Sequence, residues 1–306
     1  MKDKLVLAMD VGGTSVKACV VERGEVLRHT LTHYPSYGKE PAAVIIGQLA
    51  AIVTDLLRQY VQLTQRNLPD ELCVGLAFPG PFDYDEGTCW IRGLDKFESL
   101  YGVNVRERLL EELHAFDRTQ PARQFKVVFQ NDARLFGLGA SVRFPDERLA
   151  VITLGTGIGS CFIDRGKLVT KGPSVPADGY LFGLPHGEGI ADHCFSRRGI
   201  LALFREAGYS DDGYDVKEYA ELARRGDARA CELFWSFGLE LGSFLAPFMR
   251  QFSAERLVIG GQIAGSLDLF DEGLQQGLQT GKCYIVVEAL EDALYHTFIG
   301  ASRMFL

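Results

Sequence analysis

The sequence lacks paired cysteines, a P-loop motif and any long apolar run. Its seven cysteines are scattered without a CxxC pair, so neither a zinc site nor a redox site is predicted. The absence of GxxxxGK[ST] excludes a P-loop protein, and Gly155 to Gly159 does not have the GxGxxG spacing. The longest apolar stretch, residues 42–57, is interrupted by Gln48 and Asp55 and is too short to cross a bilayer.

No secretory segment is predicted, because the apolar run from Leu5 to Met9 is too short for a signal-peptide core. Together with an odd number of cysteines, this favours reduced thiols and a cytoplasmic location. The formal net charge of -8 repels polyanions. We therefore expect neither nucleic acid nor an anionic membrane as a partner.

The length of 306 residues favours two domains. Residues 117–124 are polar and form our boundary candidate, which gives domains over residues 1–120 and 121–289. The C-terminal helix, about residues 290–306, is expected to complete the first domain.

An internal repeat supports this division. The segment beginning at Leu7 aligns without a gap on the segment beginning at Leu149, with seven identities in twenty positions. Both indicate a strand, a Gly-rich turn, a strand, an Arg-Gly turn and a strand. Two hairpins could resemble each other by chance, but we favour a duplicated fold with one such unit opening each domain.

The remaining patterns alternate between helices and strands, which indicates an α/β architecture. Residues 171–189, rich in Gly and Pro, are expected to be irregular. Helices are predicted over residues 41–63, 105–116, 133–141, 192–207, 216–224 and 228–252, and strands over residues 72–78, 127–129, 256–259 and 285–287.

Two Gly-Thr turns are candidate phosphate sites. The first comprises Asp10, Gly12, Gly13 and Thr14, followed by Lys17. Glycines let backbone N–H groups approach phosphate oxygens, and a carboxylate at a strand end can hold Mg²⁺ through its water shell. The alternative is an ordinary hairpin turn. The second turn strengthens the phosphate interpretation, since two turns could grip a polyphosphate from both sides. It comprises Gly155, Thr156 and Gly157.

Two further motifs lie at strand ends. Asn131 and Asp132 precede a predicted helix, where a carboxylate could take the proton of an attacking hydroxyl or could simply cap the helix. Gly260 and Gly261 follow a buried strand and would allow close contact with a flat ligand such as adenine. The alternative for this pair is an ordinary strand-to-helix turn.

Taken together, these motifs resemble the ROK family of sugar kinases and repressors. The matching stretches occur in one order over nearly the whole chain: DVGGTSVK, FPGPFD, QNDA, LGTGIG, VIGG and IGAS. The resemblance implies the duplicated actin-like fold of sugar kinases, Hsp70 and actin, with two domains around a central cleft. It also implies ATP with Mg²⁺, a hexose or hexosamine phosphorylated at its 6-hydroxyl, and a homodimer. ROK repressors carry an N-terminal helix-turn-helix, and this chain starts at its first strand, so we expect the kinase branch.

By position, the resemblance assigns Asp132 as the catalytic base. Gly80, Asn131 and Asp132 would line the sugar pocket, and Asp10 would hold Mg²⁺ through water. The expected ATP-binding residues are Asp10, Gly12, Gly13, Thr14, Lys17, Gly155, Thr156, Gly157, Gly260 and Gly261.

The chain departs from the family pattern where many members have Glu-x-Gly-His, a cysteine-rich zinc motif and a later Glu that help to hold the sugar. Gly172 and Pro173 stand where Gly-His would be, and Asp192 occupies the place of the later Glu. His186 and Glu188 could replace the missing sugar ligands or could be solvent-facing loop residues. We therefore expect no structural zinc. A kinase is favoured over a non-catalytic sugar or nucleotide sensor, because a sensor needs no catalytic base.

Overall fold

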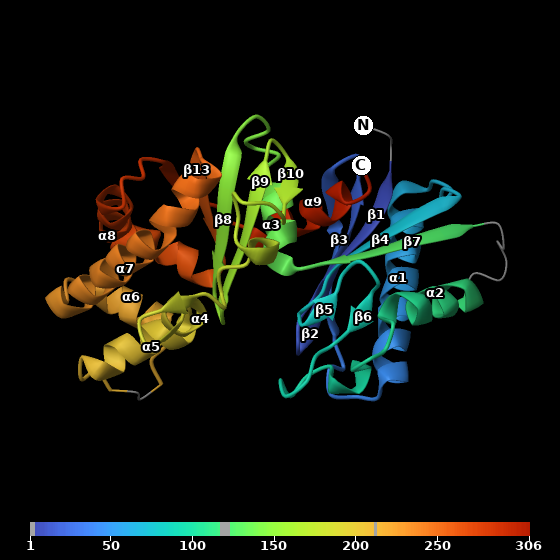
Figure 1. Cartoon of the computed structure of the whole chain (residues 1–306). Helices are drawn as coiled ribbons and strands as arrows, with labels where there is room; N and C mark the ends of the chain where they lie inside the picture. The colour runs from blue at the N-terminus through green and yellow to red at the C-terminus, as the bar shows by residue number, and fades with distance from the viewer. Residues whose placement is uncertain (1–3, 117–122, 211–212) are drawn as a thin grey trace. The chain divides into compact units, whose positions relative to one another are not determined.

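The computed structural model describes residues 4–116, 123–210 and 213–306 (Figure 1). The chain divides into two compact units. The first unit takes residues 1–139 together with 294–306, and the second takes residues 140–293. Each unit is built on a five-stranded mixed sheet.

The sheet of the first unit has the strand order β3-β2-β1-β4-β7. β1 pairs antiparallel with β2 and parallel with β4, and β4 pairs parallel with β7. The strands are β1 (Leu5–Val11), β2 (Ser15–Glu22), β3 (Glu25–Pro35), β4 (Glu71–Ala77) and β7 (Gln124–Gln130), with a small hairpin of β5 (Phe82–Asp83) and β6 (Thr88–Cys89). The helices are α1 (Ala42–Thr64), the 3-10 turn η1 (Glu98–Leu100), α2 (Val105–Phe116), α3 (Asp132–Ala140) and α9 (Ala293–Arg303).

Helices cover both faces of this sheet. Leu7 and Met9 of β1 belong to the core cluster that contains residues of α1 and α2. Val6 and Ala8, which point to the opposite face, belong to a second cluster with residues of α3 and α9. A central strand that is buried on both faces explains why β1 is almost entirely apolar up to Asp10.

The second unit repeats this topology with the strand order β10-β9-β8-β13-β14. Its strands are β8 (Arg148–Leu154), β9 (Ile158–Asp164), β10 (Lys167–Val169), β13 (Arg256–Gly260) and β14 (Val286–Ala289), with a hairpin of β11 (Pro185–His186) and β12 (Gly189–Ile190). Its helices are η2 (Ala177–Gly179), α4 (Ala191–Cys194), α5 (Arg197–Glu206), α6 (Val216–Arg224), α7 (Ala228–Phe252), η3 (Gln262–Ser266) and α8 (Leu267–Thr280).

The repeat seen in the sequence is therefore a repeat of structure. β1-β2-β3 and β8-β9-β10 occupy the same places in the two sheets. The Arg-Gly turns also match in detail, because Arg23 and Gly24 have φ of 57° and 82°, and Arg165 and Gly166 have φ of 46° and 78°. Two successive residues with positive φ form the tight hairpin turn that suits twisted strands, and the second position favours glycine. The duplicated fold predicted from the sequence is confirmed.

Glycines bring α7 and α8 into close contact, as the adjacent orange and red helices show in Figure 1. A Cβ on Gly238 would lie 2.1 Å from the carbonyl oxygen of Phe270, and a Cβ on Gly273 would lie 2.0 Å from that of Trp235. Gly242 and Gly277 make equivalent approaches one turn further along. Backbones can pack this closely only where side chains are absent, so these glycines are requirements of the core.

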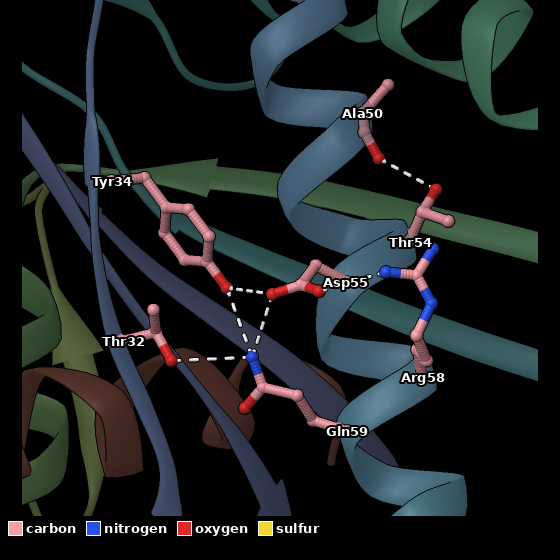
Figure 2. A network of polar contacts seen from close by, with 7 residues as sticks. All are labelled: Thr32, Tyr34, Ala50, Thr54, Asp55, Arg58 and Gln59. Carbon is pink, nitrogen blue, oxygen red and sulfur yellow. Dashed lines mark hydrogen bonds and ion pairs between the residues drawn. The ribbon is translucent and has the colours of Figure 1, made fainter.

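A polar network ties α1 to β3 in the first unit (Figure 2). The Tyr34 hydroxyl donates to Asp55 Oδ2 at 2.7 Å, and Gln59 Nε2 donates to the same oxygen at 2.8 Å. Burial and the neighbouring carboxylate raise the pKa of Tyr34 to about 12. The hydrogen bond from Tyr34 in turn lowers the pKa of Asp55. This network fixes the exposed side of α1 against the long strand β3.

Among the described residues, only α1 is long and apolar enough to span a membrane by length and composition. Its apolar residues Ile45, Leu49, Ile52 and Leu56 are buried in the core of the first unit. The helix is therefore accounted for as a core helix of this unit.

Three predictions about the elements need correction. The boundary predicted between residues 120 and 121 lies between residues 139 and 140, because β7 pairs with β4 and so belongs to the first sheet. The boundary stretch itself falls largely on residues 117–122, which lie outside the described residues. β7 spans seven residues instead of the three predicted.

The predicted helix over residues 192–207 is two helices, α4 and α5, separated at Phe195 and Ser196. Ser196 has extended backbone angles (φ -140°, ψ 174°) and starts the second helix. Gly199 permits the sharp bend, since a Cβ there would lie 1.9 Å from the carbonyl oxygen of Cys194.

Candidate active site

Three site candidates of the first unit lie at or just after the carboxyl ends of three neighbouring parallel strands. Asp10 lies near the carboxyl end of β1, Gly80 follows β4, and Asp132 follows β7. The register aligns these ends, because Asp10 pairs with Ala77 and Ala77 pairs with Gln130. The carboxyl edge of parallel strands is where α/β folds bind ligands. The structure thus brings these candidates to one edge of one sheet.

Asn131, not Asp132, caps helix α3. Asn131 Oδ1 accepts hydrogen bonds from the backbone N–H groups of Ala133 at 3.0 Å and Arg134 at 3.3 Å. Asp132 is the first residue of the helix, its side chain is exposed, and its Oδ1 accepts from the N–H of Ala133 at 2.9 Å. Because a neighbour supplies the cap, the fold does not require a carboxylate at position 132.

Asp10 sits in a charged cluster of the first unit. It pairs with Lys17 across the β1–β2 hairpin, with 3.8 Å between Lys17 Nζ and Asp10 Oδ2. Burial raises the pKa of Asp10, Lys17 opposes this shift, and the charge of Asp132 adds to it. Two interacting carboxylates at a strand edge suit Mg²⁺, which binds through one or two carboxylates and keeps several of its waters. The residues present therefore fit the ion that the family resemblance implies.

The first glycine turn is held by its own backbone and by one serine. The N–H of Gly12 donates to the carbonyl of Ser15 at 2.9 Å. Ser36 Oγ donates to the carbonyl of Gly13 at 2.7 Å, and the N–H of Ser36 donates to the carbonyl of Thr14 at 3.2 Å. The carbonyls of this turn are thus engaged, and the Thr14 side chain is exposed.

The second turn, in the other unit, is held by a carboxylate. The N–H of Gly155 donates to the carbonyl of Gly157 at 3.0 Å, and the Thr156 side chain is exposed as Thr14 is. Asp192 Oδ1 accepts from the N–H of Ile158 at 2.9 Å. The same oxygen would lie 2.5 Å from a Cβ on Gly157, so a side chain at this position would displace the Asp192 carboxylate.

Asp192 therefore has partners in the turn itself. Its second oxygen pairs with the guanidinium of Arg198 in α5, and the carbonyl of Gly155 accepts from the N–H of Arg197 at 2.7 Å. Asp192 was predicted as a sugar ligand, and its contacts in the structure connect the Gly-Thr turn to α5. A role in holding the sugar stays a prediction.

The Gly260-Gly261 pair has a structural explanation. Gly260 pairs with Thr153 of β8, and Gly261 has a φ of 87°. A Cβ on Gly261 would lie 2.3 Å from the carbonyl oxygen of Leu154. The fold demands glycine at position 261 whether or not adenosine lies against it, so adenosine contact stays a prediction.

His186 packs against aromatic residues. Its ring centroid lies 4.7 Å from that of Phe195 and 5.4 Å from that of Phe244, and its Nε2 is 3.9 Å from a carboxylate oxygen of Glu240. Glu188 is exposed. The packing of His186 is a structural role that the sequence did not indicate, and sugar binding by either residue stays a prediction.

The region of the family's zinc motif leads to a prediction about metal content. Within residues 4–116, 123–210 and 213–306, no group of three or more His, Cys, Asp or Glu side chains is arranged to hold a metal. We expect elemental analysis of the purified protein to find less than about one-tenth equivalent of zinc, since structural zinc sites bind tightly. Stoichiometric zinc after extensive dialysis would contradict this expectation.

Two charged residues near the turns were missed by the sequence analysis. Arg198 pairs with Asp192, and the side chain of Lys96 lies against Gly13. Arg198 could have been suspected from its position near the start of a predicted helix that also carries Asp192. No local pattern connects Lys96 with Gly13, because they lie far apart in the chain.

Comparison with known proteins identifies the family. The family model described as "ROK family" matches residues 6–291, and the chain belongs to this family. The curated glucokinase of Halalkalibacterium halodurans is 22% identical over 301 residues, covering 90% of this chain and 86% of the relative. The glucokinase of Thermotoga maritima is 26% identical over 285 residues, covering 85% and 82%. The DNA-binding transcriptional dual regulator NagC of Escherichia coli is 25% identical over 255 residues, covering 76% and 57%.

The fold comparison agrees. A crystal structure of a ROK family glucokinase from Streptomyces griseus in complex with glucose and AMPPNP has a TM-score of 0.70 at 21% identity and covers 98% of each chain. At this identity the likeness shows the fold. The fold of sugar kinases, Hsp70 and actin, predicted from the sequence motifs, is confirmed.

Proposed function

We propose that this protein is an ATP-dependent sugar kinase that phosphorylates a hexose or hexosamine, with the 6-hydroxyl as the acceptor. The observation that carries the proposal is the gathering of Asp10, Gly80 and Asp132 at one sheet edge. Membership of the ROK family and the two glucokinases among its relatives support the reaction class. The AMPPNP and glucose in the related crystal structure support ATP and a sugar as the substrates.

The proposed reaction assigns one proton transfer and one phosphoryl transfer. The sugar hydroxyl oxygen bonds to the γ-phosphorus while the bond from that phosphorus to the bridging oxygen breaks, which releases ADP. Asp132 accepts the hydroxyl proton, and its exposed carboxylate is available to do so. Gly80 and Asn131 line the sugar side of this edge.

The nucleotide is proposed to bind to both Gly-Thr turns and to the Gly260-Gly261 turn. Backbone N–H groups of the turns and the Thr14 and Thr156 hydroxyls would donate to phosphate oxygens. Asp10 would hold Mg²⁺ through water, and the ion would neutralise charge on the phosphates. Lys17, already placed beside Asp10, would contribute a second cation at the same end of the site.

A coupled assay of ADP release over a panel of hexoses and hexosamines tests this function. We expect sugar-dependent, Mg²⁺-dependent ADP release with at least one member of the panel. Reactions with 6-deoxy analogues then test the acceptor position by mass spectrometry, because an analogue without the 6-hydroxyl should give no phosphorylated product. ADP release that no sugar stimulates would reject the kinase.

The alternative is a non-catalytic sugar or nucleotide sensor of the same family. The regulator NagC among the relatives favours this candidate. A sensor needs no base, so calorimetric binding of a sugar without any turnover would support it.

We also propose a cytoplasmic homodimer, and equilibrium sedimentation that finds only monomer at micromolar concentration would remove the dimer from this proposal.

The two turns provide a prediction about nucleotide affinity. Gly155→Val places a side chain in open space of the second unit, since no described atom lies within 4 Å of a Cβ there. Gly12→Val is tighter, with the Ser15 carbonyl 3.0 Å away. We expect both variants to weaken ATP binding in calorimetric titration, because each side chain obstructs the approach of phosphate oxygens.

Gly155→Val is the cleaner of the two tests. Its thermal melt should match the wild type, so a loss of affinity reports on the ligand and not on folding. A folded variant that binds ATP as the wild type does would mean that its turn is only a hairpin connection.

A further inference from the structure

The aliphatic stem of Lys96 lies against the first glycine turn. A Cβ on Gly13 would be 2.8 Å from Lys96 Cδ and 3.8 Å from Lys96 Nζ. In this conformation the lysine occupies the space that a side chain at position 13 would take. The ammonium group is held beside a turn that the proposed function assigns to phosphate.

The backbone on both sides of Lys96 is fixed in an unusual conformation. Asp95 and Phe97 have φ of 56° and 58°, in the left-handed region that bulky residues rarely adopt. The Phe97 ring is fully buried, with its centroid 5.3 Å from that of Phe78. The N–H of Phe97 donates to the carbonyl of Gly38 at 2.5 Å. Such conformations persist where the surroundings impose them, and they concentrate at ligand-binding segments.

The two lysines near the turn differ in their partners. Lys17 is paired with the carboxylate of Asp10. In the part of the chain that the structure describes, Lys96 has no carboxylate partner, and its side chain is only partly exposed. The positive charge of Lys96 therefore lies beside the glycine turn, and no carboxylate of the described residues neutralises it there.

We propose that Lys96 binds the terminal phosphate of the nucleotide on the first glycine turn and stabilises its charge during transfer. This inference rests on the proposed kinase function. A lysine ammonium is a compact point charge with three donors, which suits a phosphoryl group that moves between two oxygens. ADP lacks the terminal phosphate, so Lys96 distinguishes ATP from ADP.

The test compares ATP and ADP binding, measured by calorimetry, in charge variants of Lys96. Lys96→Met keeps the stem over Gly13 and removes the charge. We expect it to weaken ATP binding about 10- to 100-fold, the range for one hydrogen bond to a charged group, while ADP affinity stays within about twofold. Lys96→Arg should restore most of the ATP affinity. The matched control is Lys39→Met in the same region, where the lysine is 71% exposed and pairs with Asp95, and it should behave as the wild type.

The other outcomes of the Lys96 binding comparison count against the proposal. Unchanged ATP affinity in a normally melting Lys96→Met overturns it, and so do equal losses for ATP and ADP, since the charge would then not follow the terminal phosphate. A lowered melt that Lys96→Arg does not restore assigns the residue to packing on Gly13 instead. A wild-type protein that binds ATP but phosphorylates no sugar rejects the kinase, while the binding comparison still decides the role of Lys96. A wild type that binds neither nucleotide overturns both.

Discussion

Asp132→Asn is expected to lower the turnover of sugar phosphorylation about 10²- to 10⁴-fold, the usual contribution of a positioned acid or base. Asn keeps the size of the side chain and an oxygen that can accept from the N–H of Ala133, as Asp132 Oδ1 does at 2.9 Å. It removes the oxygen that takes the proton. ATP binding should stay close to that of the wild type, and the affinity for the sugar should change modestly.

The structure sharpens this test, because the helix cap is supplied by Asn131. The thermal melt of Asp132→Asn should therefore be nearly unchanged, apart from the loss of a favourable charge in the first helical turn, worth about 0.3–1 kcal/mol. Glu107→Gln is a matched control, since it removes an exposed carboxylate from the first turn of α2. A normally folded Asp132→Asn that retains more than about a tenth of wild-type turnover would show that Asp132 is not the base.

The parts of the fold that could be predicted are those encoded locally. The turns at Arg23 and Arg165 each have two residues with positive φ. Glycine at the second position is typical of such a hairpin turn, so the turns could be predicted from the local sequence. The helix over residues 228–252 was predicted with its observed limits because its apolar period is long. α8 was not predicted, since Gly273 and Gly277 lower its intrinsic helix propensity and are explained only by their contact with α7.

Non-local pairing accounts for the misplaced domain boundary. The polar stretch before Gln124 is a reasonable linker signal, but β7 pairs with β4 along its whole length and α3 shares a core cluster with α9. Nothing in the local sequence of β7 says which sheet it joins.

The candidate site shows the same limit. Asp10 and Asp132 were found because each lies at a strand end, Gly80 was found from the family resemblance, and strand register aligns the three. The contact of Lys96 with Gly13 and that of Asp192 with Ile158 depend on loop conformation. The sequence showed which residue types could take part in the chemistry, but it did not show which other residues they contact.

The motif IGAS near the C-terminus was part of the family resemblance, and the structure gives its glycine a packing role. A Cβ on Gly300 would lie 1.8 Å from the carbonyl oxygen of Leu135 in α3. A Cβ on Gly139 would lie 1.8 Å from the carbonyl oxygen of His296 in α9. The two helices therefore touch through paired glycines, and α9 supports the helix that begins with Asp132.

Gly300→Ala is expected to destabilise the protein by about 1–3 kcal/mol, the usual cost of overpacking a core. Ordinary contacts between such atoms are about 3.5 Å long, so α3 and α9 must move apart. For a unit of this size the melting temperature should fall by about 2–4 °C per kcal/mol. Turnover should fall as well, up to about 100-fold, because a shift of about 1 Å in a catalytic group can have that effect.

Gly47→Ala is the matched control, since it makes the same change within α1, where no described atom lies within 4 Å of a Cβ. It should leave turnover unchanged and raise stability by up to about 1 kcal/mol, the difference in helix propensity between the two residues. Thermal melts and steady-state rates of both variants decide the matter. If Gly300→Ala melts and turns over as the wild type does, α3 and α9 can separate without consequence, and the C-terminal helix does not hold Asp132 in place.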